Sequence, residues 1–239
     1  MESTKTRTIA VQAALCIVPF IISLTLIGDP LPPQPAPLGK QIPVQPPDAY
    51  DKIDVKESLI AMEGLIKGST AEQDLLAKEI SAHSDRYIPP VLYALAAALF
   101  RNHKPEGALF WSAAAQLRAR YDIARCADVS VEDTAEVLED EYTTEIRQYI
   151  AANPDAYERA ADRALKWDQI TPFNYDCRWI NLHGMGAFGA GPVELSKPES
   201  KWPILHLNAR TDFLEDEKKL LKRLRTTKKP ASGSPKTAP

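Results

Sequence analysis

The chain has 239 residues, 44% of them apolar and 26% charged, which is the composition of an ordinary globular protein with one core. The formal net charge is −3, but acidic residues outnumber basic ones from Asp51 to Asp212, whereas every charged residue from Lys218 onward is basic. A nucleic-acid-binding protein is expected to carry positive charge on its folded body, so this distribution argues against that class.

The first predicted element is the uncharged apolar stretch 9–28, which is long enough to cross a hydrocarbon core of about 30 Å as a helix. It is longer than the apolar region of most signal peptides and lacks an A-x-A cleavage pattern. An uncleaved membrane anchor is therefore favoured over a cleaved signal peptide, with a buried soluble helix as a third alternative. Lys5 and Arg7 precede the stretch and Asp29 follows it, so the positive-inside rule places residues 1–8 in the cytoplasm.

The rest of the chain is then expected outside the cytoplasm, in the periplasm of a bacterium. Residues 29–49 form a proline-rich linker, which cannot be helical and is predicted to be an extended spacer. A ligand for a proline-recognising domain is the alternative interpretation of this segment.

Residues 50–214 are predicted to form an all-α domain built from consecutive helix pairs, because no segment shows the alternation of a strand. In the first pair, Asp54 and Glu57 are spaced like a capping box, Gly68 ends the first helix, and Ser69 or Thr70 caps the second.

The central pair runs from Pro89 to Cys126, with Pro89 and Pro105 each opening a helix. A third pair begins at Ser130 or Asp133, and its two helices are separated at Asn153–Pro154. Polar residues at the end of the central pair are expected to tie it to its neighbours; they are Arg118, Arg120, Asp122 and Arg125.

The central pair resembles a helix pair of the tetratricopeptide or Sel-type repeat family. The residues that carry the resemblance are Tyr93, Ala94, Ala97, Leu99, Phe100, Ala108, Phe110, Trp111, Ala114 and Ala115. Asn102–His103 stands where these repeats have a glycine before the turn, and the other two pairs do not match residue by residue. The resemblance implies helical hairpins packed in a repeat-like way and a protein that binds other proteins on a concave surface.

Residues 171–192 are rich in aromatic residues and glycine. Gly184 to Gly189 match the pattern G-x-G-x-x-G, but Ala190 to Pro192 would stop the helix that a dinucleotide site needs, so we interpret the match as chance. Asp176, Arg178 and His183 could serve as an acid, an anion-binding group and a base. The alternative is a loop ordered by its own hydrogen bonds or used as an interface.

Seven acidic residues gather between residues 132 and 145. Such a run is usually a solvated face, but in a binding protein it would attract a basic partner. Partner contacts are therefore predicted for Glu132, Asp133, Glu136, Glu139, Asp140, Asp176, Arg178, Trp179, Asn181 and His183.

The last predicted helix spans residues 212–225, and residues 215–239 are interpreted as a basic amphipathic and then disordered tail. We expect one of two arrangements for this helix: its leucines pack on the domain, or its basic face lies on anionic lipid.

Two cysteines lie beyond the apolar stretch, Cys126 and Cys177. In an oxidising compartment they are expected to form a disulfide, and two unpaired buried thiols are the alternative. The four histidines are scattered, and the motifs HExxH, CxxC and GxSxG are absent, so we expect no metal, no cofactor and no enzymatic activity.

In its predicted location and its helical scaffold, the chain resembles the periplasmic immunity proteins that neutralise antibacterial effectors, such as those delivered by type VI secretion. The resemblance implies a single-pass protein of the bacterial inner membrane that binds a secreted effector. An envelope scaffold or assembly factor is the alternative, and an enzyme using Asp176, Arg178 and His183 is another.

Overall fold

The computed structural model describes residues 49–189 and 194–228. These residues are helical apart from connecting turns and an isolated bridge between Cys126 and Ser196, which confirms the predicted all-α class. None of the helices in this part of the chain has the length and apolar composition needed to cross a membrane. The predicted anchor 9–28, residues 1–8 and the linker up to residue 48 lie outside the described residues.

The first helix pair consists of α1 (Lys56–Lys67) and α2 (Thr70–Ala82), and the break between them lies at Gly68 and Ser69, as the sequence predicts. A side chain at Gly68 would collide with the carbonyl oxygen of Gly64, so a glycine ends α1. Ser69 and Glu72 form a capping box at the start of α2. The capping box predicted for α1 does not form, because the carboxylate of Asp54 accepts a hydrogen bond from the backbone of Lys56 instead.

The central pair, α3 (Pro89–Arg101) and α4 (Pro105–Arg125), forms the middle of the core. Apart from the partly exposed Ala124, the alanines of both helices are buried, and their small side chains allow close approach of the two helix axes. The turn between the helices places His103 at a φ of 57°, the left-handed region that favours glycine. His103 therefore takes the conformation that the missing glycine would supply.

The third pair differs from the prediction. The segment predicted to form its first helix is divided into two helices, α5 (Thr134–Tyr142) and α6 (Thr144–Ala152). The chain leaves helical geometry at Thr143, whose hydroxyl donates a hydrogen bond of 2.8 Å to the carbonyl of Glu139. α7 (Pro154–Ile170) follows and packs against α4.

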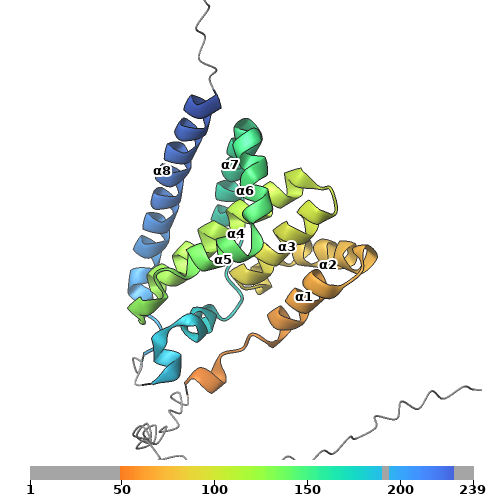
Figure 1. The fold of residues 1–239 in the computed structure, drawn as a ribbon. Helices are drawn as coiled ribbons and strands as arrows, with labels where there is room; N and C mark the ends of the chain where they lie inside the picture. The colour runs from red at the N-terminus through yellow and green to blue at the C-terminus, as the bar shows by residue number, and fades with distance from the viewer. Residues whose placement is uncertain (1–48, 190–193, 229–239) are drawn as a thin grey trace, which may run out of the picture. The chain divides into compact units, whose positions relative to one another are not determined.

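The last helix, α8 (Trp202–Lys228), begins ten residues before the predicted start at Asp212. It runs beside α7 and also packs on α4 (Figure 1). The boundary predicted between residues 214 and 215 falls inside this helix, and Thr226 to Lys228 are helical rather than part of a disordered tail. Residues 229–239 lie outside the described part of the chain.

Short 3-10 helices connect these elements: η1 (Tyr50–Lys52), η2 (Ser84–Arg86), η3 (Val129–Val131), η4 (Cys177–His183), η5 (Met185–Phe188) and η6 (Glu199–Lys201). The segment Trp179 to Leu182 is part of η4.

Candidate functional site

A buried ion pair fixes the end of α7 to the middle of α4. The side chains of Arg118 and Asp168 are each 1% exposed, and Arg118 Nε lies 2.9 Å from Asp168 Oδ1. The guanidinium also donates to the carbonyls of Thr171 and Pro172 and stacks on the ring of Phe173 at 3.7 Å. Arg118 therefore holds the start of the aromatic loop, the segment that begins at Thr171, against the core. This agrees with the prediction that Arg118 connects the central helix pair to its neighbours.

Asp122 fixes the following part of the loop. This carboxylate is fully buried and accepts hydrogen bonds from Arg125, from the hydroxyl of Tyr175 and from the indole of Trp179, the last at 2.6 Å. Burial raises the pKa of Asp122. Trp179, which the sequence assigned to a partner interface, is 1% exposed and belongs to the core.

Asp176 and Arg178 pair with each other, at 2.6 Å between Arg178 Nη2 and Asp176 Oδ2. Arg178 also donates to the carbonyl of Lys52, and Asp176 accepts from the backbone of Asp54, so the two residues join the loop to the start of the domain. Partial burial acts to raise the pKa of Asp176, but hydrogen bonds from Arg178 and Asp54 lower it below its usual value. This arrangement supports the structural interpretation of the loop over the catalytic one.

His183 is exposed and packs edge-on against Trp179, with ring centroids 5.4 Å apart. Asn181 is fully buried and donates to the carbonyls of Arg178 and Leu195. Of the loop residues predicted to contact a partner, Trp179 and Asn181 are thus interior residues, and His183 lies at the surface.

The expected disulfide between Cys126 and Cys177 is not present, since both are free thiols. Cys126 is buried, and its Sγ donates a hydrogen bond to Asn181 Oδ1 at 3.2 Å. Burial raises the pKa of the Cys126 thiol to about 11, so this cysteine is a packed, protonated side chain.

The first glycine of the G-x-G-x-x-G pattern is explained by packing. A side chain at Gly184 would collide with the carboxylate of Asp128, which accepts a hydrogen bond from the backbone of Gly186 at 2.8 Å. The glycine is thus needed for close approach to the segment that leads into η3.

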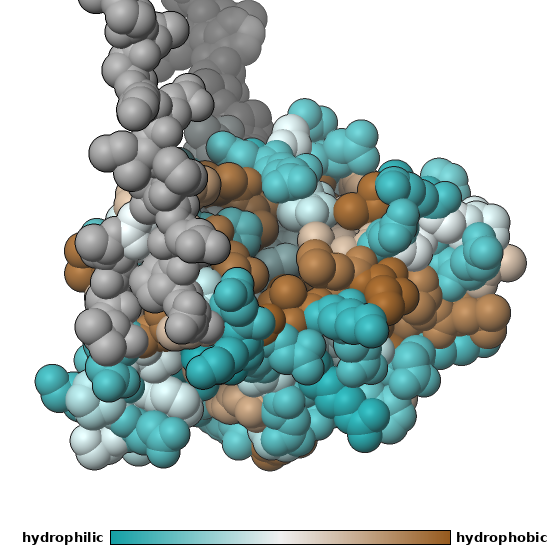
Figure 2. Space-filling model, turned by 90° about the horizontal axis from the view of Figure 1, so that it is seen from below, coloured by the Kyte–Doolittle hydropathy of each residue, from teal (hydrophilic) through white to brown (hydrophobic). Residues whose placement is uncertain are grey.

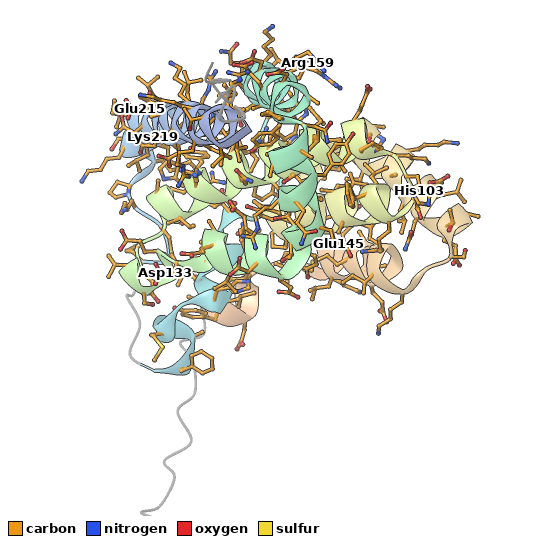
Figure 3. The ribbon with its side chains drawn as sticks, turned by 45° about the horizontal axis from the view of Figure 1, so that its top comes forward. His103, Asp133, Glu145, Arg159, Glu215 and Lys219 are labelled. Carbon is orange, nitrogen blue, oxygen red and sulfur yellow. The ribbon has the colours of Figure 1, made fainter. Side chains whose placement is uncertain are left out.

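An acidic groove of about 470 Å³ lies between α4, α5 and α8. Its acidic lining is Glu132, Asp133, Glu136, Glu139 and Asp212. Figure 3 shows Asp133 at the start of α5. The guanidinium in this lining is that of Arg120, which lies 2.8 Å from Asp216 and is therefore already paired. Four residues of the acidic run, Glu132, Asp133, Glu136 and Glu139, thus contribute one wall of a groove. Asp140 pairs with Arg147 at 2.6 Å, and Glu141 and Glu145 line a different pocket.

A second groove, of about 590 Å³, lies between α4, α5, α6, α7 and α8 and shares Arg120 and Glu139 with the first. We call it the Glu217 groove. The side chain of Glu217 is buried, and its Oε1 accepts a hydrogen bond of 2.9 Å from the hydroxyl of Tyr157. Burial raises the pKa of Glu217 to about 7 and also raises the pKa of Glu139.

No protein-family model matches the chain, and neither a curated protein nor a solved structure is significantly similar to it. The candidate site therefore has to be interpreted from its own geometry.

The Glu217 groove was not predicted from the sequence, although one signal was available. Glu217 lies four residues after Phe213 and four before Leu221, so it occupies a position in the apolar stripe of the helix. A glutamate at such a position is desolvated on folding and is a candidate for a perturbed pKa.

Proposed function

We propose that the chain is a protein-binding module and that its acidic groove receives a basic protein. The observation that carries the proposal is the composition of the groove, where carboxylates from α5 and α8 face a guanidinium that Asp216 already neutralises. Such a surface attracts a partner of opposite charge, raises its association rate and disfavours acidic competitors.

The more specific proposal is a membrane-anchored periplasmic immunity protein that binds and neutralises a cognate antibacterial effector. It is supported by the acidic groove, whose charge suits a basic effector, and by the apolar stretch 9–28, whose role as an anchor remains a prediction. A tetratricopeptide-like envelope scaffold is the competing proposal and would use the same surface. The two differ in whether binding abolishes the partner's activity.

Affinity capture from detergent-solubilised cells tests the proposal. We expect the wild-type chain to recover a dominant partner rich in lysine and arginine, and the variant Glu132→Gln/Glu136→Gln to recover several-fold less of it. The matched control is Glu106→Gln/Asp162→Asn, which removes the same charge at two exposed positions on α4 and α7.

Equal recovery by the groove variant and the control would contradict the proposed binding surface. An immunity role further requires that the captured protein be toxic when produced alone in the periplasm and harmless when produced with this chain.

A further inference from the structure

The turns η3, η4 and η5 carry large apolar side chains that are exposed at one end of the described domain (Figure 1). Val129 of η3 is 79% exposed, and Met185 and Phe188 of η5 are 70% and 68% exposed. Leu182 of η4 is exposed as well. Figure 2 views the molecule from this end, where hydrophobic residues are visible between hydrophilic ones. We call these four residues the apolar tip.

Hydrogen bonds between the turns hold the apolar tip together. Ser130 Oγ accepts one of 2.8 Å from the backbone of Met185, and the carboxylate of Asp128 accepts one of 2.8 Å from the backbone of Gly186. Residues three apart on a 3-10 helix share a face, so Met185 and Phe188 lie on the same side of η5. Several large apolar side chains gathered on a fixed surface are typical of an interaction site.

The segments that form the apolar tip carry negative charge. Glu132 and Asp133 follow Val129 within four residues, are exposed and line the acidic groove. Residues 126–146 and 179–196 contain no lysine or arginine. Burial lowers the pKa of His183 in η4, so this histidine is neutral near pH 7. The apolar tip therefore continues directly into the acidic groove.

The neighbouring elements do not reverse this charge. Arg178 of η4 is paired with Asp176 at 2.6 Å. In η1, which contacts Arg178 through the carbonyl of Lys52, the charge of Lys52 is offset by that of Asp51. The ammonium of Lys197 donates to a carbonyl at the end of α4. The surroundings of the tip thus favour an occupant that is apolar and positively charged.

A lipid surface and a protein could both cover an apolar tip, and the charges favour a protein. Anionic headgroups would be repelled by Glu132 and Asp133, whereas a lysine or arginine would be attracted by them. An apolar centre beside a charged rim is also the usual composition of a protein interface.

We propose that the apolar tip docks a protein segment in which an apolar side chain stands beside lysine or arginine. The apolar side chain covers Met185 and Phe188, and the cations face Glu132 and Asp133. That this segment belongs to the basic partner of the acidic groove rests on the proposed function. The tip adds the short-range contact to that binding, because charges mainly raise the association rate whereas a desolvated apolar contact slows dissociation.

The test measures binding of a short peptide of lysine, leucine and phenylalanine to the full chain in phosphatidylcholine nanodiscs, since detergent would itself cover an apolar surface. Empty nanodiscs give the background. One comparison peptide has serine in place of leucine and phenylalanine, and the other has glutamate in place of lysine. Met185→Ser/Phe188→Ser removes the apolar contact. Leu75→Ser/Ile170→Ser is the matched control, because these two residues are similarly exposed on α2 and α7.

We expect the peptide to bind the wild-type chain and the control variant within about twofold of each other. It should bind Met185→Ser/Phe188→Ser about tenfold more weakly, through faster dissociation. Equal weakening by both variants, equal binding of either comparison peptide, or no binding to the wild-type chain would overturn the proposal.

A second variant keeps the test decisive if Met185→Ser/Phe188→Ser does not fold. Phe188→Trp places an indole at the tip, and its fluorescence, relative to that of the wild type, should shift to shorter wavelength when the peptide binds. An unchanged spectrum overturns the proposal. Quenching by bromine-labelled lipid in the absence of peptide also overturns it, because the tip then lies on the membrane.

The same variants separate this proposal from the proposed function. Peptide binding at the tip together with failed capture of a basic partner would reject the proposed function and leave the tip assignment standing. Capture that is weakened by Glu132→Gln/Glu136→Gln but unaffected by Met185→Ser/Phe188→Ser would do the reverse.

Discussion

The side chain of Glu217 has its pKa raised to about 7 by burial, against 4.5 for an unperturbed glutamate. The groups that face it are Tyr157 on α7, Arg120 on α4, Glu139 on α5 and the neighbouring Asp216. Between these two pKa values the folded chain binds a proton that the unfolded chain has released. The contribution of Glu217 to the free energy of unfolding is therefore most favourable below pH 4.5, falls as the pH rises to about 7, and is then constant. The total loss is about 3 kcal/mol.

Glu217→Gln should remove this pH dependence, because an amide does not ionise. We expect the variant to be more stable than the wild type by about 3 kcal/mol at pH 8 and nearly equal to it at pH 4. Urea denaturation across this pH range measures the difference, with Glu215→Gln, at an exposed position of the same helix, as the control that should follow the wild type. A variant that is less stable at pH 8 would show that the charged form of Glu217 is favoured in the fold.

Asp168 holds a different kind of buried charge, because it is paired. It contacts Arg118 at 2.9 Å and His206 at 2.6 Å. Asp168→Ala leaves the guanidinium buried without its partner, and we expect it to lower the free energy of unfolding by about 3–5 kcal/mol. Asp162→Ala, at an exposed position of the same helix, should change it by less than about 0.5 kcal/mol. Similar midpoints of urea unfolding for both variants would contradict a stabilising role for this ion pair.

At the level of single helices, the capping box of α2 offers a local test. Ser69 Oγ accepts a hydrogen bond from the backbone of Glu72, and the Glu72 carboxylate accepts one of 2.7 Å from the backbone of Ser69. Ser69→Ala should cost about 1 kcal/mol of stability, since the orphan amide of Glu72 loses its acceptor. Ser81→Ala on the same helix is the control and should be close to neutral, because Ser81 is exposed and bonds only to the carbonyl of Ala77. Equal thermal unfolding midpoints for the two variants would argue against the cap.

Helix boundaries were predictable where proline, glycine or a capping residue marks them. Pro89, Pro105 and Pro154 open α3, α4 and α7 as expected. The break at Thr143 was missed because apolar residues continue at helical spacing from α5 into α6, so the sequence pattern is that of one helix. The early start of α8 was missed because Ile204 and Leu207 are more than half exposed and do not mark a buried face, although Pro203 in the first turn was a usable signal.

The candidate site was predictable only where its residues are neighbours in the sequence. Glu132, Asp133, Glu136 and Glu139 come from one segment, and their clustering was visible without a structure. The Glu217 groove instead joins side chains from α4, α5, α6, α7 and α8, and contacts at such separation depend on how the helices pack. The burial of Trp179 and Asn181 was missed for the same reason, because both are buried by segments distant in the sequence.

For the molecule as a whole, the sequence placed a domain boundary between residues 214 and 215, whereas α8 is continuous through this point. The half of α8 that follows contributes Leu221, which is 5% exposed, and the hydrogen bond between Glu217 and Tyr157. It also contributes the ion pairs of Arg225 with Asp155 and Glu158.

A chain ending at residue 214 therefore loses packing that the domain needs, and we expect its free energy of unfolding to fall by at least about 3 kcal/mol. The reference is a chain ending at residue 228, which retains every described contact of α8. Urea unfolding of the two chains decides between the alternatives, because a true boundary at 214 predicts equal midpoints. An integral α8 predicts a clear loss for the shorter chain, because the buried Leu221, the hydrogen bond of Glu217 with Tyr157 and the ion pairs of Arg225 are removed together.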